Sequence, residues 1–184
     1  MFIIALGLLD PGDELLIPCP GYNPYLQAAE LTQAKLVEIR TSMETNFTIT
    51  AEMVRQHITP RSKVLVLINP GNPTGSVIPP EEVSRICEVA KEHDLIVVSD
   101  EIYARITYDD HRAQPVAVLP GMHERTITLS GVSKAYAMTG WRVGYSAPSV
   151  RWLGLGLGLG LRLRLRTLSL SLILREPYPY PYPY

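Results

Sequence analysis

The chain has 184 residues, of which 46% are hydrophobic and 19% charged, a composition typical of a globular protein rather than of a disordered or fibrous one. Its 17 Lys and Arg nearly balance its 18 Asp and Glu, so the net charge of -1 argues against a nucleic-acid-binding surface over the whole chain. Two cysteines, Cys19 and Cys87, lack the spacing of a disulfide or zinc site, so we expect no metal and a reduced, cytoplasmic setting.

The first half of the chain predicts alternating helices and strands. The apolar run 1–9 is too short to span a bilayer, and we expect it to be the end of a core helix and not a membrane segment. A short buried strand at 15–17, a helix at 25–31 and a strand at 35–40 follow. Thr50 is a suitable cap for a helix that turns Met53, Val54 and Ile58 inward.

The second half carries the stronger signals. The β-branched run 63–69 predicts a strand buried on both faces, and Pro79 and Pro80 begin a helix with acidic residues in its first turn. Further strands are expected at 95–99, 126–130 and 141–146, with a loop or helix at 133–140. This alternation predicts an α/β fold with a doubly wound, mostly parallel sheet. Ligands bind such sheets beyond the carboxyl ends of the strands.

Three of those strand ends carry polar side chains. The loop NPGNPTG can aim the amide of Asn72, the segment DEIY places Asp100 and Tyr103 after a strand, and Lys134 and Arg142 follow the next one. Taken singly, these are also typical of a plain turn, a salt-bridged strand end and a solvated lysine. Their convergence on one sheet edge favours a site.

A lysine, a carboxylate and an arginine suit one kind of cofactor. A lysine amine with a lowered pKa forms a Schiff base with an aldehyde such as pyridoxal phosphate. A carboxylate such as Asp100 keeps the pyridine nitrogen of that cofactor protonated, and Arg142 can bind its phosphate through two hydrogen bonds. Asn72 and Tyr103 are suited to contact its ring oxygen.

These residues lie in stretches that resemble the class I/II aminotransferases of the fold type I pyridoxal-phosphate enzymes. The stretches are LLDPGDELLIPCPGYNPY, NPGNPTG, SDEIY and SGVSKAYAMTGWRVGY, and the resemblance covers about residues 3–148. It implies that Lys134 holds the cofactor covalently, that Asp100 pairs with its pyridine nitrogen, and that Tyr103 and Asn72 contact its ring hydroxyl.

The resemblance also implies a phosphate site and a stacking residue. Arg142 and Ser133 would bind the phosphate, and Tyr22 would stack on the cofactor ring. It further implies a cis peptide bond between Asn72 and Pro73, amino acid and 2-keto acid substrates, and a homodimer. The balanced charge and the short apolar run lead us to expect no nucleic-acid and no membrane partner. In that reaction the freed lysine moves the Cα proton, and the amino group passes to a keto acid.

The family pattern is incomplete at both ends of this sequence. We expect residues 1–150 to be a large domain that lacks the Gly/Ser/Thr phosphate loop ahead of its first helix, and the small domain with its carboxylate-binding arginine is not recognisable. Two alternatives to the aminotransferase therefore stay open. One is a pyridoxal-phosphate lyase, racemase or decarboxylase of the same fold, and the other is an aminotransferase-like fragment without turnover.

Residues 151–184 differ in kind from the rest. Leu alternates there with Gly, then Arg, then Ser, before a PY repeat, and the segment holds five Arg and one Glu. We expect that this low-complexity tail does not form a domain and that it has no evolved role. An amphipathic strand, an anionic-surface binder or a polyproline-like ligand are the functional alternatives, with Arg162, Arg164 and Arg166 as carboxylate binders only in principle.

Overall fold

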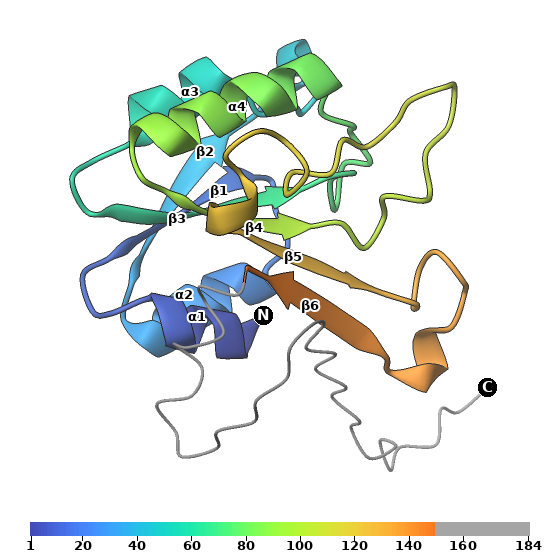
Figure 1. Ribbon diagram of the computed structural model, residues 1–184, viewed down its shortest axis with the longest axis horizontal. Coiled ribbons are helices and arrows are strands. Elements are labelled where there is room, and N and C mark those ends of the chain that lie inside the picture. Colours follow the sequence, from blue (N-terminus) through green and yellow to red (C-terminus); the bar gives the residue numbers. More distant parts are fainter. Residues whose placement is uncertain (150–184) are drawn as a thin grey trace.

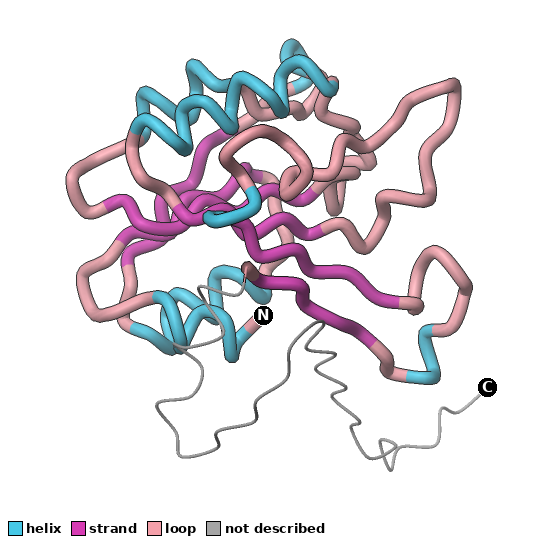
Figure 2. Tube along the Cα trace, viewed as in Figure 1, coloured by secondary structure: helices cyan, strands magenta, loops and turns pink. Residues whose placement is uncertain are grey.

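A computed structural model describes residues 1–149 as three layers, with a central sheet between two pairs of helices (Figures 1 and 2). The tail 151–184, with its three candidate arginines, lies outside the described residues. The strands run in the order β2-β1-β3-β4-β5-β6, with β6 antiparallel to β5 and the other pairs parallel. They are β1 (Glu14–Cys19), β2 (Lys35–Arg40), β3 (Ser62–Ile68), β4 (Ile96–Asp100), β5 (Thr126–Gly131) and β6 (Gly144–Pro148). The mostly parallel α/β sheet predicted from the sequence is confirmed.

Helices cover both faces of the sheet. Helices α1 (Phe2–Leu8) and α2 (Pro24–Thr32) lie below it in Figure 1, and α3 (Ala51–His57) and α4 (Pro80–Glu92) lie above it. Each face has its own apolar core, built around Leu16, Leu65 and Ile86 on the α3/α4 side and around Val66, Val98 and Tyr25 on the α1/α2 side. Short 3-10 turns are η1 (Met43–Thr45), η2 (His123–Arg125) and η3 (Thr139–Trp141).

Local signals in the sequence explain where two of the helices begin. The Thr50 hydroxyl accepts a hydrogen bond from the Met53 N–H, as expected of a helix cap. The Glu82 carboxylate of α4 accepts a second bond from the Ala51 N–H at 2.7 Å, so α4 also holds the first turn of α3. Pro80 occupies the first turn of α4, where its missing N–H has no helical partner to lose.

The last strand begins later than the sequence pattern predicts. Residues 141–146 were expected to form a strand, but β6 runs from Gly144 to Pro148. Trp141 closes the η3 turn with 69% of its surface exposed, and Arg142 adopts a left-handed conformation with φ of 52°. This break in the backbone prevents Trp141 and Arg142 from joining the ladder, because a strand requires extended dihedral angles.

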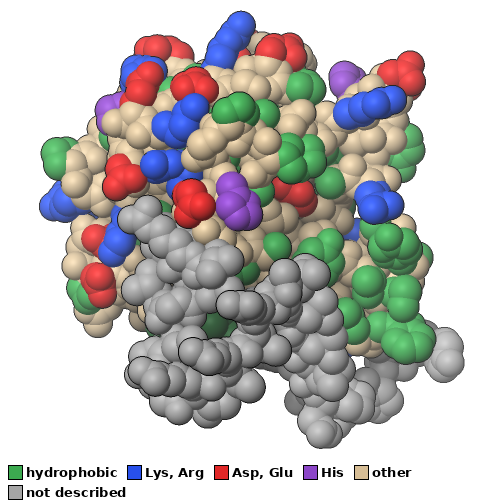
Figure 3. Space-filling view, in the orientation of Figure 1, with side chains coloured by type: hydrophobic (Ala, Val, Ile, Leu, Met, Phe, Trp, Pro, Cys, Tyr) green, Lys and Arg blue, Asp and Glu red, His purple; other side chains and the backbone are tan. Residues whose placement is uncertain are grey.

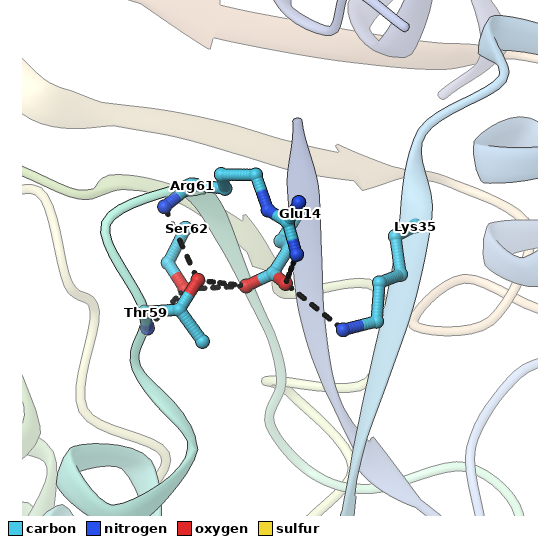
Figure 4. A network of polar contacts seen from close by, with 5 residues as sticks. All are labelled: Glu14, Lys35, Thr59, Arg61 and Ser62. Carbon is cyan, nitrogen blue, oxygen red and sulfur yellow. Dashed lines mark hydrogen bonds and ion pairs between the residues drawn. The ribbon is translucent and has the colours of Figure 1, made fainter. Parts of the chain in front are cut away.

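A buried carboxylate joins three strands at the edge of the sheet where β1 begins (Figure 4). The Glu14 side chain is fully buried and accepts hydrogen bonds from Thr59 at 2.6 Å, Ser62 at 3.0 Å and Lys35 at 3.1 Å. Arg61 adds an ion pair at 3.7 Å. A buried carboxylate is tolerated when its oxygens are bonded in this way, so this network fixes β1 against its two neighbours.

Among residues 1–149, no helix has the length and apolar character that crossing a membrane requires. The two cysteines are unpaired there, and no group of His, Cys, Asp and Glu side chains within these residues is suited to hold a metal ion.

Candidate functional site

The loops that follow β1, β3, β4 and β5 meet at the carboxyl edge of the sheet and enclose a pocket of about 380 Å³. All seven residues that the sequence singled out line it: Tyr22, Asn72, Asp100, Tyr103, Ser133, Lys134 and Arg142. They come from segments up to 120 residues apart in the sequence. The parallel sheet brings them together because the parallel strands end at the same edge.

Asp100 is the last residue of β4 and is largely buried. Its Oδ2 accepts a hydrogen bond of 2.8 Å from the Tyr25 phenol, and its Oδ1 accepts a longer one of 3.3 Å from the Ile102 N–H. Burial raises the pKa of the Asp100 carboxyl above its ordinary value, while these two hydrogen bonds oppose that rise. Asp100 is therefore a desolvated carboxyl group held in one orientation.

Tyr103 and Lys134 face each other across the pocket. The Lys134 ammonium nitrogen lies 5.9 Å from the centre of the Tyr103 ring, a cation–π distance. Among the residues that the structure describes, Lys134 is exposed. The free amine is accessible to a molecule that enters the pocket.

The NPGNPTG loop is a closed turn that presents Asn72. The Gly75 N–H donates to the Gly71 carbonyl at 2.9 Å, and the Gly71 N–H donates to the Ser76 carbonyl at 2.8 Å. The Asn72–Pro73 peptide bond is cis, as predicted, and the Asn69–Pro70 and Cys19–Pro20 bonds are also cis. The loop thus holds the Asn72 amide at the pocket wall.

Arg142 and Ser133 lie on the segment that links β5 to β6. The Arg142 guanidinium donates a hydrogen bond of 3.0 Å to the Thr139 carbonyl and otherwise remains exposed at the pocket. Hydrophobic side chains gather over this segment in the space-filling view, and the exposed ones there are Tyr136 and Trp141 (Figure 3). A guanidinium held from one side with its other donors free is suited to bind an anion.

Tyr22 forms the wall nearest to α2. Tyr22 is 44% exposed, and its ring meets the Tyr25 ring edge to face, with the centroids 6.3 Å apart. A second hollow of about 550 Å³ adjoins the pocket, shares Tyr22 and Arg142 with it, and is bordered by the first residues of α1 and by β6.

The sequence interpretation missed the hydrogen-bond partner of Asp100 and five other residues of the pocket wall, which are Ile68, Ile102, Leu129, Ser130 and Thr139. Tyr25 was assigned only to a helix, yet it is the hydrogen-bond donor to Asp100. Its signal was the spacing Tyr22-x-x-Tyr25 across a helix start, which places both rings on one side of the first turn. Ser130 and Thr139 also line the pocket, but as small hydroxyl residues they had no distinguishing pattern.

Comparisons with known proteins show which family the chain belongs to. A family model described as aminotransferase class I and II matches residues 2–154. The chain belongs to the class I and II aminotransferase family. It is 49% identical over 145 residues to an aspartate aminotransferase of Musicola paradisiaca and 43% identical over 150 residues to one of Pyrococcus abyssi. These matches cover 79% and 80% of this chain.

Solved structures show the same fold. The crystal structure of an aromatic aminotransferase from Pyrococcus horikoshii matches 85% of this chain with a TM-score of 0.81 and 38% identity. The aspartate aminotransferase of Thermus thermophilus, in a structure with maleate, matches 84% with a TM-score of 0.77 and 38% identity. This chain spans 36% and 39% of the two aspartate aminotransferases matched by sequence, and 42% and 40% of these two structures.

Proposed function

We propose that residues 1–150 form the cofactor-binding large-domain part of a pyridoxal-phosphate-dependent aminotransferase. The observation that carries the proposal is the convergence of Lys134, Asp100 and Arg142, with four further side chains, on one pocket. Family membership supports it, because the residues in question lie within the matched segment. The tail 151–184 is not part of the proposed site.

The residues of the pocket fit the chemistry of pyridoxal phosphate. At about 380 Å³ the pocket lies within the range of small-molecule sites. It offers an exposed amine, a partly buried carboxyl group, an exposed guanidinium and an aromatic ring, which match an aldehyde, a pyridine nitrogen, a phosphate and a ring face. Asn72 and Tyr103 add donors for the ring hydroxyl.

When bound, the cofactor supplies an electron sink that stabilises a carbanion at the substrate Cα. The residues of this chain supply position and proton transfer. Asp100, oriented by Tyr25, would hold a proton on the pyridine nitrogen, since a neighbouring carboxylate favours the charged form of that ring. The Lys134 Nζ would bind the aldehyde and, once released, move the Cα proton as base and then acid.

The substrates in this proposal are an amino acid and a 2-keto acid. The names of the relatives point to two donor classes, because some are aspartate aminotransferases and another is an aromatic aminotransferase. Aspartate and phenylalanine, each with 2-oxoglutarate as acceptor, are therefore the first pairs to assay.

A homodimer is part of the proposal. Large apolar side chains of α1 and α2 are exposed at Ile3, Leu6 and Leu26. Ile3 and Leu6 are three residues apart and share one face of α1, and adjoining exposed apolar side chains are typical of a surface that another protein covers. Sedimentation of the full chain tests this element. A monomer at micromolar concentration would remove the dimer from the proposal without touching the cofactor site.

A second candidate is a protein that binds pyridoxal phosphate without turnover. The deciding experiment incubates the full chain with pyridoxal phosphate, each donor and 2-oxoglutarate, and measures glutamate. Glutamate that Lys134→Ala abolishes supports the aminotransferase. Cofactor binding without glutamate supports the second candidate, and ammonia or sulfide without a new amino acid supports a lyase.

A further inference from the structure

Glu101 is a second carboxylate beside the pocket that the proposed reaction does not use. It directly follows Asp100, its side chain is partly buried, and no Lys or Arg of residues 1–149 forms an ion pair with it. Burial and the charge of Asp100 both raise the pKa of the Glu101 carboxyl. A carboxylate without a cation at such a position needs another explanation.

One oxygen of Glu101 makes two hydrogen bonds. Oε1 accepts from the Ser99 hydroxyl at 2.9 Å and from the Val116 N–H at 3.4 Å. Ser99 is the neighbour of Asp100 within β4, whereas Val116 lies on the far side of the long connection that leads from β4 toward β5. Glu101 therefore links Val116, within the connection, to Ser99 of β4, the strand at which the connection begins.

The two adjacent carboxylates form hydrogen bonds on opposite faces of the sheet. Asp100 bonds to Tyr25, which belongs to the apolar core on the α1/α2 side, while Glu101 bonds to Val116, which belongs to the core on the α3/α4 side. Successive side chains of a strand point to opposite faces, so each carboxylate fixes the end of β4 from its own side.

The backbone of Glu101 extends the tie to β5. Its N–H donates to the Leu129 carbonyl at 2.8 Å, and its carbonyl accepts from the Ala104 N–H at 3.0 Å and, at 3.4 Å, from the Ser130 hydroxyl. Leu129 and Ser130 line the pocket together with Tyr103. Glu101 thus stands where the turn that carries Tyr103 meets the strand that leads to Lys134.

We propose that Glu101 is a positioning residue for the cofactor pocket, which holds the segment 102–116 against β4 and thereby keeps Tyr103 and Asp100 in place. The effect of Glu101 on cofactor affinity rests on the proposed function, whereas its effect on the position of segment 102–116 does not. Glu101 itself does not line the pocket, so it acts through Tyr103 and Asp100 and touches no reacting group.

Limited trypsin digestion of the cofactor-free chain tests the tie directly, because the exposed Arg105 and Arg112 lie within the tied segment. Loss of the hydrogen bonds in Glu101→Ala is expected to raise cleavage at these two sites roughly tenfold, since cleavage follows the population of the opened segment. Glu101→Gln keeps an acceptor oxygen and is expected to remain within about threefold of the parent chain. Glu52→Ala, at an exposed glutamate of α3, is the matched control.

Cofactor titration of the same variants tests the consequence for the pocket. We expect Glu101→Ala to weaken pyridoxal phosphate binding about tenfold and Glu101→Gln to restore most of it. Unchanged cleavage in Glu101→Ala, or faster cleavage with unchanged cofactor affinity, would overturn the proposal. If Glu101→Ala does not fold, Glu101→Asp, whose shorter side chain cannot reach both donors, replaces it with the same expected and contrary outcomes.

The two proposals fail in different ways. If the parent chain binds no pyridoxal phosphate, the proposed function fails, while the digestion pattern alone still decides whether Glu101 holds the segment. Faster cleavage at Arg105 and Arg112 supports the tie in that case, and cleavage at the parent rate refutes it.

Discussion

The Tyr25 phenol donates a hydrogen bond of 2.8 Å to the Asp100 carboxylate across 75 residues of sequence. The donor is on α2, below the sheet, and the acceptor is at the end of β4, so this bond joins a covering helix to the pocket. The pKa of the Tyr25 phenol is raised by burial and by the neighbouring Asp100, which keeps it a donor at all physiological pH values.

Tyr25→Phe removes this donor without changing the shape of the ring. Because the hydrogen bond opposes the effect of burial on Asp100, its loss is expected to raise the Asp100 pKa further. Pyridoxal phosphate binding should then weaken about tenfold near neutral pH and recover as the pH rises. A titration of affinity against pH checks this. Tyr22→Phe, which keeps the Tyr25 hydroxyl, is the control and should keep the pH profile of the parent chain. The same profile in Tyr25→Phe would mean that Tyr25 does not lower the pKa of Asp100.

Asp100→Asn is expected to stabilise the cofactor-free protein at neutral pH. The pKa of Asp100 is higher in the folded than in the unfolded protein, so the folded state favours the protonated form. The contribution of Asp100 to the free energy of unfolding is therefore fully present below the ordinary pKa of 3.8 and is lost as the pH rises through the folded-state pKa. The unfolding free energy of Asp100→Asn should therefore exceed that of the parent chain increasingly above about pH 4, and the two should not differ for this reason in stronger acid. Urea unfolding at several pH values measures it. Equal stability of both proteins at pH 7 would contradict the cost assigned to this burial.

Glu14→Gln tests the opposite edge of the sheet. Burial pushes the Glu14 pKa upward, but hydrogen bonds from Thr59, Lys35 and Ser62 hold it below its ordinary value of 4.5. Its contribution is therefore present above pH 4.5 and lost as the pH falls through the folded-state value. We expect the variant to lose about 1–2 kcal/mol of unfolding free energy at pH 7 and to approach the parent in acid.

The same variant separates stability from cofactor binding. Glu14 is the first residue of β1, whereas the pocket lies beyond the carboxyl end of that strand, and none of the residues in the Glu14 network lines the pocket. Cofactor affinity measured on folded protein should be unchanged. A loss of affinity comparable with that of Tyr25→Phe would show that the binding assays report general stability.

Gly131→Ala should disturb the segment that carries Lys134. A Cβ at Gly131 would lie 2.9 Å from the carbonyl oxygen of Val143, the residue just before β6, closer than real Cβ contacts. The strands must separate to admit it, and we expect a loss of about 1–3 kcal/mol in unfolding free energy together with weaker cofactor binding. Gly140→Ala, where nothing lies within 4 Å, is the control and should change neither quantity. Equal melting temperatures for both variants would refute the close approach.

Much of the fold followed from patterns that are local in sequence. The continuous apolar run of β3 and the proline start of α4 need no tertiary information, because burial on both faces and a missing N–H act within a few residues. The start of β6 could not be read in this way. Trp141 and Val143 are residue types common in strands, but the left-handed backbone of Arg142 between them interrupts the strand. No local sequence pattern indicates that conformation.

The pocket was predictable to a different degree. Strand-end positions indicated where Asn72, Asp100 and Lys134 would gather, since parallel strands end at one edge. The Tyr25–Asp100 hydrogen bond depends on how α2 packs under the sheet, and the Glu101–Val116 bond depends on the path of a long loop. Both are tertiary contacts, which spacing along the chain does not specify.

Chemical trapping of the cofactor on Lys134 tests the central claim most directly. The full chain is incubated with pyridoxal phosphate, reduced with borohydride, digested with trypsin and analysed by mass spectrometry. The account predicts a phosphopyridoxyl group on Lys134 in the peptide 126–142, whose internal cleavage at Lys134 the modification blocks, and its loss in Lys134→Ala. Labelling spread over surface lysines such as Lys35 and Lys91, with Lys134 no more labelled than they are, would contradict it.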